Sequence, residues 1–258
     1  MIKIATLFSG SSGNCTLIKT ECTAILIDAG RNCKAICTGL CSLGLSIEDI
    51  DAIFVTHEHK DHISALDVLM RKRPIPIHST MPSSRELCKK ADVAKCTCIH
   101  DSLEYTVKVG DLTVTSFPLP HDSAAHVGYI AESDDGDRAG VATDMGFITA
   151  LAVEKLCHCR QAVIEANHDR GMLMYGPYPQ FLKERILSKL GHLSNKDSAI
   201  LCCEMAKSGT EKIILAHLSF ENNTPDRALS AVNQLLEAEG YTEHITVKVA
   251  GREVATVI

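Results

Sequence analysis

Residues 57–62, with the sequence HEHKDH, place three histidines and two acids within six positions, directly after the short apolar run AIFVT. In an extended segment His57 and His59 point to the same side, because side chains alternate along a strand. Asp61 and His62 would then open a helix, where an acid suits the N-terminus. One loop can therefore offer two imidazoles to one cation, and a carboxylate with an imidazole to another.

Three further residues of ligand type stand at the ends of other apolar runs. His121 follows LTVTSFPLP, Asp144 follows GVAT and His217 follows KIILA. Strand ends that face loops are where α/β proteins assemble their sites, because the sheet fixes the backbone while the side chains converge. A single histidine after a strand is usually an ordinary polar residue in a turn. Four strand ends that each carry a residue of ligand type predict a metal-binding site instead.

The H-x-H-x-D-H pattern at 57–62 resembles the motif of the metallo-β-lactamase fold. The other landmarks follow in the family's order: Asp28 in LIDAG, His121 in PLPHD, Asp144 in VATDMG and His217 in LAHLS. Within this superfamily the chain is most similar to the YycJ/WalJ group. That similarity rests on SGSSGNC (9–15), IEANHD (164–169), GPYP (176–179), GHLSN (191–195) and LAHLSFENNTP (215–225).

The resemblance covers essentially the whole chain and implies an α/β fold, a four-layer αββα sandwich, with a dinuclear metal site. The ligands it implies are His57, His59 and His121 for the first metal, Asp61, His62 and His217 for the second, and Asp144 for both. Asp28 would orient the histidine loop rather than bind metal. The expected cofactors are two divalent metal ions, because histidines suit zinc while carboxylates with exchangeable waters also admit manganese or iron.

The resemblance also implies a 5′-to-3′ exonuclease acting on DNA. The expected nucleophile is a hydroxide supplied by the dinuclear site, with Asp61 orienting it or accepting its proton. The departing alkoxide needs a proton from elsewhere. His192 lies in a glycine-led turn before a predicted helix, and Glu165 ends the apolar run AVIEA, where an unpaired acid is costly. Glu165 would accept a hydrogen bond from His192 and hold it as the general acid, with helix capping by His192 as the structural alternative.

Contacts to substrate are expected from the Gly/Ser-rich loop 9–14, which could present backbone amides and hydroxyls to a phosphate or could be an ordinary turn. Its candidate residues are Ser9, Ser11, Ser12 and Asn14. His168 either lines the same cleft or forms a structural polar pair with Asp169. Tyr175 and Tyr178 are candidates for stacking on an end base. The basic run RKRP (71–74) either follows a nucleic-acid backbone or is a solvated face.

The composition is that of an ordinary globular protein. The chain has 258 residues, 45% of them hydrophobic and 22% charged, and a net charge of −6. We expect no membrane association, since no apolar run approaches the roughly 18 residues of a membrane span. The start of the chain does not resemble a signal peptide, so a cytoplasmic location with reduced thiols is expected for the twelve cysteines. Cys33, Cys37 and Cys41 are predicted to lie on one helix face as small apolar residues.

The order of elements predicts one domain over residues 1–258, in which sheets are covered by helices. Ten strands are predicted: KIATLF, CTLIK, TAILID, AIFVT, LTVTSF, HVGYIAE, AGVATD, QAVIEA, KIILAH and ITVKVA. Helices are predicted over 32–43, 62–71, 82–91, 180–190, 195–207 and 225–239. His126 is expected to be a strand residue close enough to the site to perturb the metal shell.

The leading hypothesis is therefore a metal-dependent phosphodiesterase with nucleic acid as its substrate, DNA being favoured over RNA. One alternative is a hydrolase of a thioester, lactone or β-lactam on the same fold, for which a leaving-group acid would be less necessary. A second alternative is a metal-bearing scaffold that binds a nucleotide without catalysis. The predicted pair of Glu165 and His192 favours phosphodiester cleavage.

Overall fold

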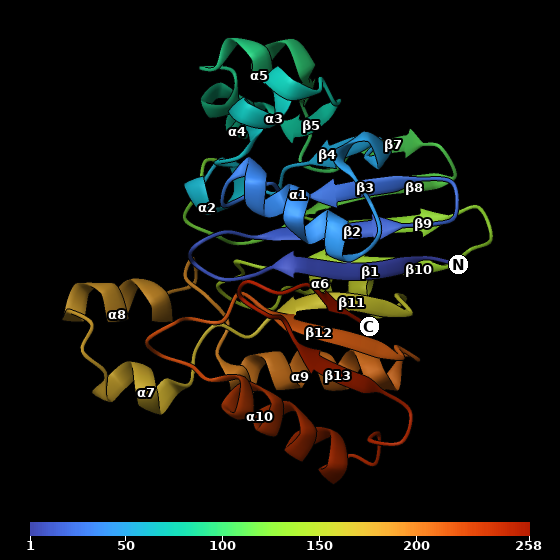
Figure 1. The fold of residues 1–258 in the computed structure, drawn as a ribbon. Helices are drawn as coiled ribbons and strands as arrows, with labels where there is room; N and C mark the ends of the chain where they lie inside the picture. Colours follow the sequence, from blue (N-terminus) through green and yellow to red (C-terminus); the bar gives the residue numbers. More distant parts are fainter.

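The computed structural model describes residues 1–258 and consists of two facing β-sheets with helices on their outer sides (Figure 1). The first sheet has the order β14 (Thr256–Val257), β1 (Lys3–Phe8), β2 (Cys15–Lys19), β3 (Ala24–Ile27), β4 (Ala52–Phe54), β5 (Ile77–Thr80) and β6 (Thr97–His100). The second has the order β13 (Thr246–Val249), β12 (Lys212–Ala216), β11 (Gln161–Glu165), β10 (Arg138–Ala142), β9 (Val127–Ser133), β8 (Leu112–Pro118) and β7 (Thr106–Val109).

The helices fall into three sets. Those beside the first sheet are α1 (Cys33–Ser42), α2 (Lys60–Ile63), α3 (Leu66–Lys72), α4 (Met81–Leu87) and α5 (Ala91–Cys96), with a 3-10 turn at Ile47–Asp49. Those beside the second sheet are α6 (Ala150–Leu156), α9 (Asn195–Lys207) and α10 (Pro225–Ala238). The remaining two, α7 (Arg170–Tyr175) and α8 (Gln180–Leu187), project from the body of the protein (Figure 1). No helix is both long enough and apolar enough to span a bilayer.

Three apolar clusters hold these layers together. The central cluster joins the sheets, since Ile4 and Ile18 of the first sheet pack with Val114 and Ile214 of the second. A second cluster lies between the first sheet and its helices, and a third between the second sheet and α6, α9 and α10. The arrangement is helix, sheet, sheet, helix, so the predicted αββα sandwich is confirmed.

Parallel pairing brings the functional strand ends to one edge. β3 pairs in parallel with β4, and β10, β11 and β12 pair in parallel with one another. Three non-glycine residues just past these strands take a left-handed backbone: Asp28 with φ 64°, Asp144 with φ 57° and His217 with φ 56°. Such a conformation costs on the order of 1–3 kcal/mol for each residue and is found mainly where function requires it. These three residues thus lie at the same edge, where the parallel strands end.

All ten predicted strands are present, but some helices differ from the prediction. The single helix predicted over 62–71 is wrong, because the chain breaks between α2 and α3 to bond with the loop after β3. There, Ala29 N donates to His62 O over 2.7 Å and Ala65 N donates to Ala29 O over 2.9 Å. The helix predicted over 82–91 ends at Leu87. The strands β5, β6, β7 and β14 and the helices α5, α6 and α7 were not predicted.

The cysteines are all free, but the face predicted on α1 is only partly apolar. Cys33 is buried, Cys37 is half-buried and Cys41 is exposed. The prediction that all three serve as packed apolar residues is therefore wrong for Cys41, which stands at the solvent end of the helix.

Candidate metal centre

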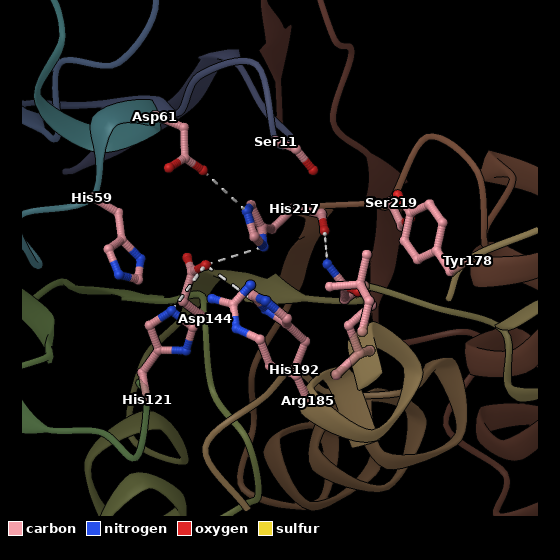
Figure 2. A pocket seen from close by; sticks show the side chains of 13 residues that line it. Ser11, His59, Asp61, His121, Asp144, Tyr178, Arg185, His192, His217 and Ser219 are labelled. Carbon is pink, nitrogen blue, oxygen red and sulfur yellow. Dashed lines mark hydrogen bonds and ion pairs between the residues drawn. The ribbon is translucent and has the colours of Figure 1, made fainter. Parts of the chain in front are cut away.

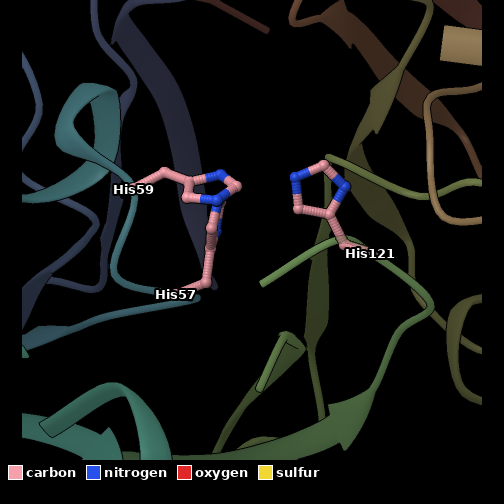
Figure 3. A group of neighbouring side chains, drawn as sticks. All are labelled: His57, His59 and His121. Atoms are coloured by element: carbon pink, nitrogen blue, oxygen red, sulfur yellow. The ribbon is translucent and has the colours of Figure 1, made fainter. Parts of the chain in front are cut away.

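Side chains of metal-ligand type converge at the edge where the parallel strands end (Figures 2 and 3). In each of four groups, the nitrogen or oxygen atoms of the members lie within 4.8 Å of one another. The groups are His57, His59 and His121; Asp61, His62 and His217; His57, His62 and Asp144; and Asp144, Glu165, His192 and His217. The structure thus brings together all seven residues that the sequence predicts as ligands.

Most of the histidine rings in these groups are anchored through Nδ1. His62 Nδ1 lies 2.7 Å from Asp28 Oδ2, and His217 Nδ1 lies 3.0 Å from Glu165 Oε1. His57 Nδ1 lies 3.0 Å from the hydroxyl of its neighbour in sequence. A hydrogen bond at one ring nitrogen fixes the tautomer and directs the other nitrogen at a metal. Asp28 has the geometry of an orienting residue, since it also accepts a hydrogen bond from the backbone N–H of Thr56 over 2.8 Å.

Several atoms that face the centre are buried and have no partner. They include Nε2 of His57, Nε2 of His217 and Oδ2 of Asp144. A polar atom buried without a hydrogen bond is costly, so these atoms are set up for a ligand. Imidazole nitrogens and carboxylate oxygens together are the donor set of divalent zinc, manganese and iron. The residues therefore fit the cations that the sequence predicts.

The electrostatics of the centre favour positive charge. Burial lowers the pKa of His217, but Asp144, Asp61 and Glu165 raise it by more, to about 10. Burial lowers the pKa of His57 well below its usual value, and His62 lowers it further, which keeps that ring neutral and able to donate a lone pair. Buried carboxylates next to neutral imidazoles attract a cation.

Glu165 is fully buried and uses both carboxylate oxygens. Oε1 accepts from His192 Nδ1 over 2.8 Å and from His217 Nδ1 over 3.0 Å. Oε2 accepts from the backbone N–H groups of Met145, over 2.8 Å, and of Leu193, over 3.0 Å. Burial raises the pKa of this carboxyl group, but His192 and His217 lower it to about 2, so the group is ionised. The predicted contact with His192 is present, and the second contact with His217 was not predicted.

A pocket of about 270 Å³ opens over the centre (Figure 2). One wall carries predicted site residues and the other comes from loops and from α8. The lining residues are Ser11, His59, Asp61, His121, Asp144, Asn167, Tyr178, Leu182, Arg185, Ile186, His192, His217 and Ser219. His192 lies at its edge, with 14% of its side chain exposed.

The residues predicted to contact phosphate are divided between two places. Ser11 lines the pocket, whereas the exposed Ser12 does not. Ser9 Oγ accepts from His217 N over 2.7 Å. Asn14 Nδ2 lies 3.1 Å from His62 Nε2 and 3.4 Å from an oxygen of Asp61. Ser9 and Asn14 therefore contact residues of the centre itself, His217 for Ser9 and Asp61 and His62 for Asn14.

Two further histidines near the centre do not line the pocket. His168 is buried, with no partner on either ring nitrogen, and Asp169 caps α7 by accepting from Met172 N instead of pairing with it. His126 is buried just before β9, so it is not a strand residue as expected. Its Nε2 donates to Thr143 O over 2.7 Å, and its ring lies edge-on to that of His57 with centroids 4.6 Å apart.

Arg185 and Asp122 were not predicted, although both bear on the site. Arg185 lines the pocket, and its Nε lies 2.5 Å from Asp122 Oδ2, next to His121 in the chain. Nothing in the sequence pairs α8 with the loop after β8, because the two are 63 positions apart. Only the letters HD after a strand gave a signal for Asp122.

Comparison with known proteins supports the same interpretation. A family model described as a beta-lactamase superfamily domain matches residues 23–218. The exodeoxyribonuclease YycJ of Bacillus anthracis is 34% identical over 243 residues, which cover 93% of this chain and 91% of that protein. The exodeoxyribonuclease WalJ of Streptococcus pneumoniae is 37% identical over 244 residues, which cover 92% of this chain and 89% of that protein.

Solved structures share the fold at lower identity. The metallo-β-lactamase fold protein YhfI of Bacillus subtilis has a TM-score of 0.74 and 14% identity, over 100% of this chain and 99% of that one. The short form of human tRNase Z has a TM-score of 0.68 and 16% identity, over 99% of this chain and 98% of that one. At these identities the likeness concerns the fold alone.

Proposed function

The chain belongs to the metallo-β-lactamase superfamily, and we propose that it is a metal-dependent exonuclease that degrades DNA from the 5′ end. The observation that carries this proposal is the set of anchored rings around Asp144, with His192 at the edge of the same pocket. Two relatives named as exodeoxyribonucleases, which match along nine-tenths of the chain, support DNA as the substrate class.

We assign the ligands from the side chains that converge at the centre. His57, His59 and His121 would hold one cation, Asp61, His62 and His217 would hold the other, and Asp144 would contact both. Glu165 is left out because all its acceptor positions toward the centre are used by hydrogen bonds. When bound, two divalent cations, zinc or manganese or iron, would stabilise charge on a phosphate and lower the pKa of a water molecule.

Two protein side chains would accept and donate the protons of the reaction. Asp61 reaches the pocket with a carboxylate that can orient the attacking water and accept its proton. His192 donates its Nδ1 hydrogen to Glu165, so the imidazolium form of the ring presents Nε2–H to the departing alkoxide. It gives that proton as the P–O bond breaks and is left as a neutral imidazole with its hydrogen on Nδ1. Glu165 stays ionised throughout and holds the ring in place.

A degradation assay on end-labelled DNA tests the proposal. Chelated protein is resupplied with zinc or manganese and given single- or double-stranded DNA or RNA, with and without a 5′ phosphate. We expect stepwise loss of nucleotides from the 5′ end of DNA, stopped by chelator and by Asp61→Ala. His192→Ala should reduce kcat by roughly 10²- to 10⁴-fold, the usual range for loss of a general acid.

Glu154→Ala, which changes an exposed carboxylate on α6, is the matched control and should behave as the wild type. Failure of the metal-loaded protein to cleave any nucleic acid would refute the nuclease proposal, and turnover of thioester or lactone substrates would replace it. Normal nuclease turnover by His192→Ala would remove the general-acid role and leave the rest intact.

A further inference from the structure

The segment 170–190, here called the arm, exposes large apolar side chains. It contains α7, α8 and the GPYP turn between them, and it stands clear of both sheets (Figure 1). Tyr175 is 94% exposed, Phe181 72% and Met174 52%. Apolar side chains gathered on one exposed segment usually mark a binding surface.

The arm is also basic within an acidic protein. It contains four basic residues and one acidic residue, for a net charge of +3, while the whole chain has a net charge of −6, which leaves −9 for the remainder. Arg170, Arg185 and Lys189 are exposed. Of these, Arg185 pairs with Asp122, whereas Arg170 and Lys189 form no ion pair. In the basic run at 71–74 both arginines are paired, Arg71 with Asp67 at 3.1 Å and Arg73 with Glu48 at 2.9 Å. The arm is therefore the part of the surface suited to a polyanion.

The arm is continuous with the proposed active site. Tyr178, Leu182 and Arg185 line the same pocket as Asp61 and His192 (Figure 2). A polymer whose end lies in the pocket must leave over or beside this wall.

Hydrogen bonds fix the arm against the centre. Asp122 N donates to Leu190 O over 3.1 Å, and His121 Nδ1 lies 3.2 Å from Gly191 O. Within the arm, Lys183 Nζ donates to the backbone oxygen of Met174 over 2.8 Å and ties α8 to α7. The turn at Gly176 needs glycine, since a Cβ there would lie 2.5 Å from a backbone oxygen of α7. The exposed rings thus stand on a preorganised platform.

We propose that the arm is a docking surface for single-stranded DNA, on which Tyr175, Tyr178 and Phe181 stack on bases while the basic side chains face the backbone. Rings on a basic surface bind single strands because every base offers a flat face, and a duplex keeps those faces covered. This inference rests on the proposed function in one respect, that the end of the strand enters the metal pocket. It specifies a substrate with an unpaired end.

Binding of a nuclease-resistant phosphorothioate dT oligonucleotide, followed by fluorescence anisotropy with the metal-loaded protein, tests the proposal. Tyr175→Ala and Phe181→Ala should each weaken binding by about 5- to 150-fold, the range measured for loss of one stacked base. Tyr175→Trp should retain affinity because it keeps a stacking ring. Ile99→Ala on β6, which changes a side chain that is 50% exposed outside the arm, is the control and should have no effect.

Two further measurements separate stacking from a general loss of affinity. A 2-aminopurine base placed near the 5′ end should lose fluorescence on binding to the wild type and keep it on binding to Tyr175→Ala. Lys189→Gln should reduce the slope of log affinity against log salt by about 0.7, as expected for one lost phosphate contact on a single strand. A blunt duplex of equal length should bind more weakly than the single strand.

Wild-type affinity in both alanine variants would overturn the proposal. So would a dimer whose mass falls in these variants while DNA binding is unchanged, because the arm would then be a contact between two copies of the chain. Binding of the single strand through the arm without any cleavage would leave the docking surface intact and refute the nuclease. Cleavage of DNA with no effect of the arm variants would support the nuclease and refute the docking surface.

Discussion

Replacing Glu165 with glutamine should change the tautomer of a predicted metal ligand. The amide has one oxygen and one NH2 group, whereas the carboxylate accepts on both sides. If the NH2 group faced Met145 N and Leu193 N, two buried backbone donors would lose their acceptor, and a backbone N–H cannot change its role. The amide oxygen should therefore remain on that side, so that the NH2 group faces the rings of His192 and His217.

Both rings must then accept at Nδ1 and carry their hydrogen on Nε2. For His217 this removes the lone pair that would face the cation, and the ring must adopt an unfavourable tautomer to bind it. Loss of such an orienting partner typically weakens metal binding by about 10- to 100-fold. The corresponding change in binding free energy is about 1.4–2.8 kcal/mol.

Two measurements on Glu165→Gln check this reasoning. Competition with a chelating indicator gives the metal affinity, and ¹⁵N-edited NMR of the imidazoles in the metal-free protein, at a pH where the His217 ring is neutral, gives its tautomer. Glu154→Gln on the exposed face of α6 is the matched control. Wild-type metal affinity together with a His217 ring still protonated on Nδ1 would refute the argument. The amide would then have served as acceptor for the two backbone N–H groups and for both ring Nδ1–H groups, as the carboxylate does.

Three other substitutions test the framework of the site. Asp28→Asn keeps one oxygen for Thr56 N but replaces Oδ2, which takes part in two hydrogen bonds of 2.7 and 2.8 Å, by an NH2 group. It should lower the free energy of unfolding by about 1–3 kcal/mol, measured by calorimetry on metal-free protein. Gly30→Ala would place a Cβ 1.8 Å from the backbone oxygen of Asp61, so it should lower the free energy of unfolding in urea by at least about 3 kcal/mol. Gly44→Asn is the control. A Cβ at Gly44 would meet no atom within 4 Å, and asparagine tolerates the local φ of 73°. Burial raises the pKa of Asp137, but two contacts of 2.7 Å with Arg160 lower it below its usual value overall. Its contribution is present above the unfolded pKa and lost as the pH falls through the folded one, so Asp137→Asn should reduce the urea midpoint at pH 7, and the reduction should become smaller as the pH is lowered.

The sequence predicted the strands and the centre because both have strong local signals. Most of the predicted strands are short apolar runs bounded by turn residues, and the ligand residues stand where such runs stop. Local pattern failed for β5 and β6, because their sequences IHST and TCIH are not apolar runs. It also failed at Ala65, where a tertiary backbone bond to the loop after β3 divides a stretch with helical periodicity.

The wall of the pocket that contains Tyr178 and Arg185 could not be predicted from the sequence for a different reason. Tyr178 and Arg185 reach the pocket because the arm folds back and hydrogen-bonds near His121, across about 60 residues of chain. The same applies to Ser9 and Asn14, which looked like phosphate contacts and instead hold His217 and the histidine loop. Residue type indicates that a loop is functional, but only packing decides which side chain faces the ligand.

At Asp28, Asp144 and His217 the left-handed backbone costs folding free energy at residues that the proposed activity requires. Glycine or asparagine would adopt these angles at lower cost, so the metal-free chain should tolerate or favour them at Asp144 and His217, whereas at Asp28 the hydrogen bonds lost on substitution outweigh that gain. A screen for thermal resistance alone would therefore tend to erase the centre, starting with the residues that matter most to it. Attempts to stabilise this protein should keep these three positions unchanged and seek their gains elsewhere.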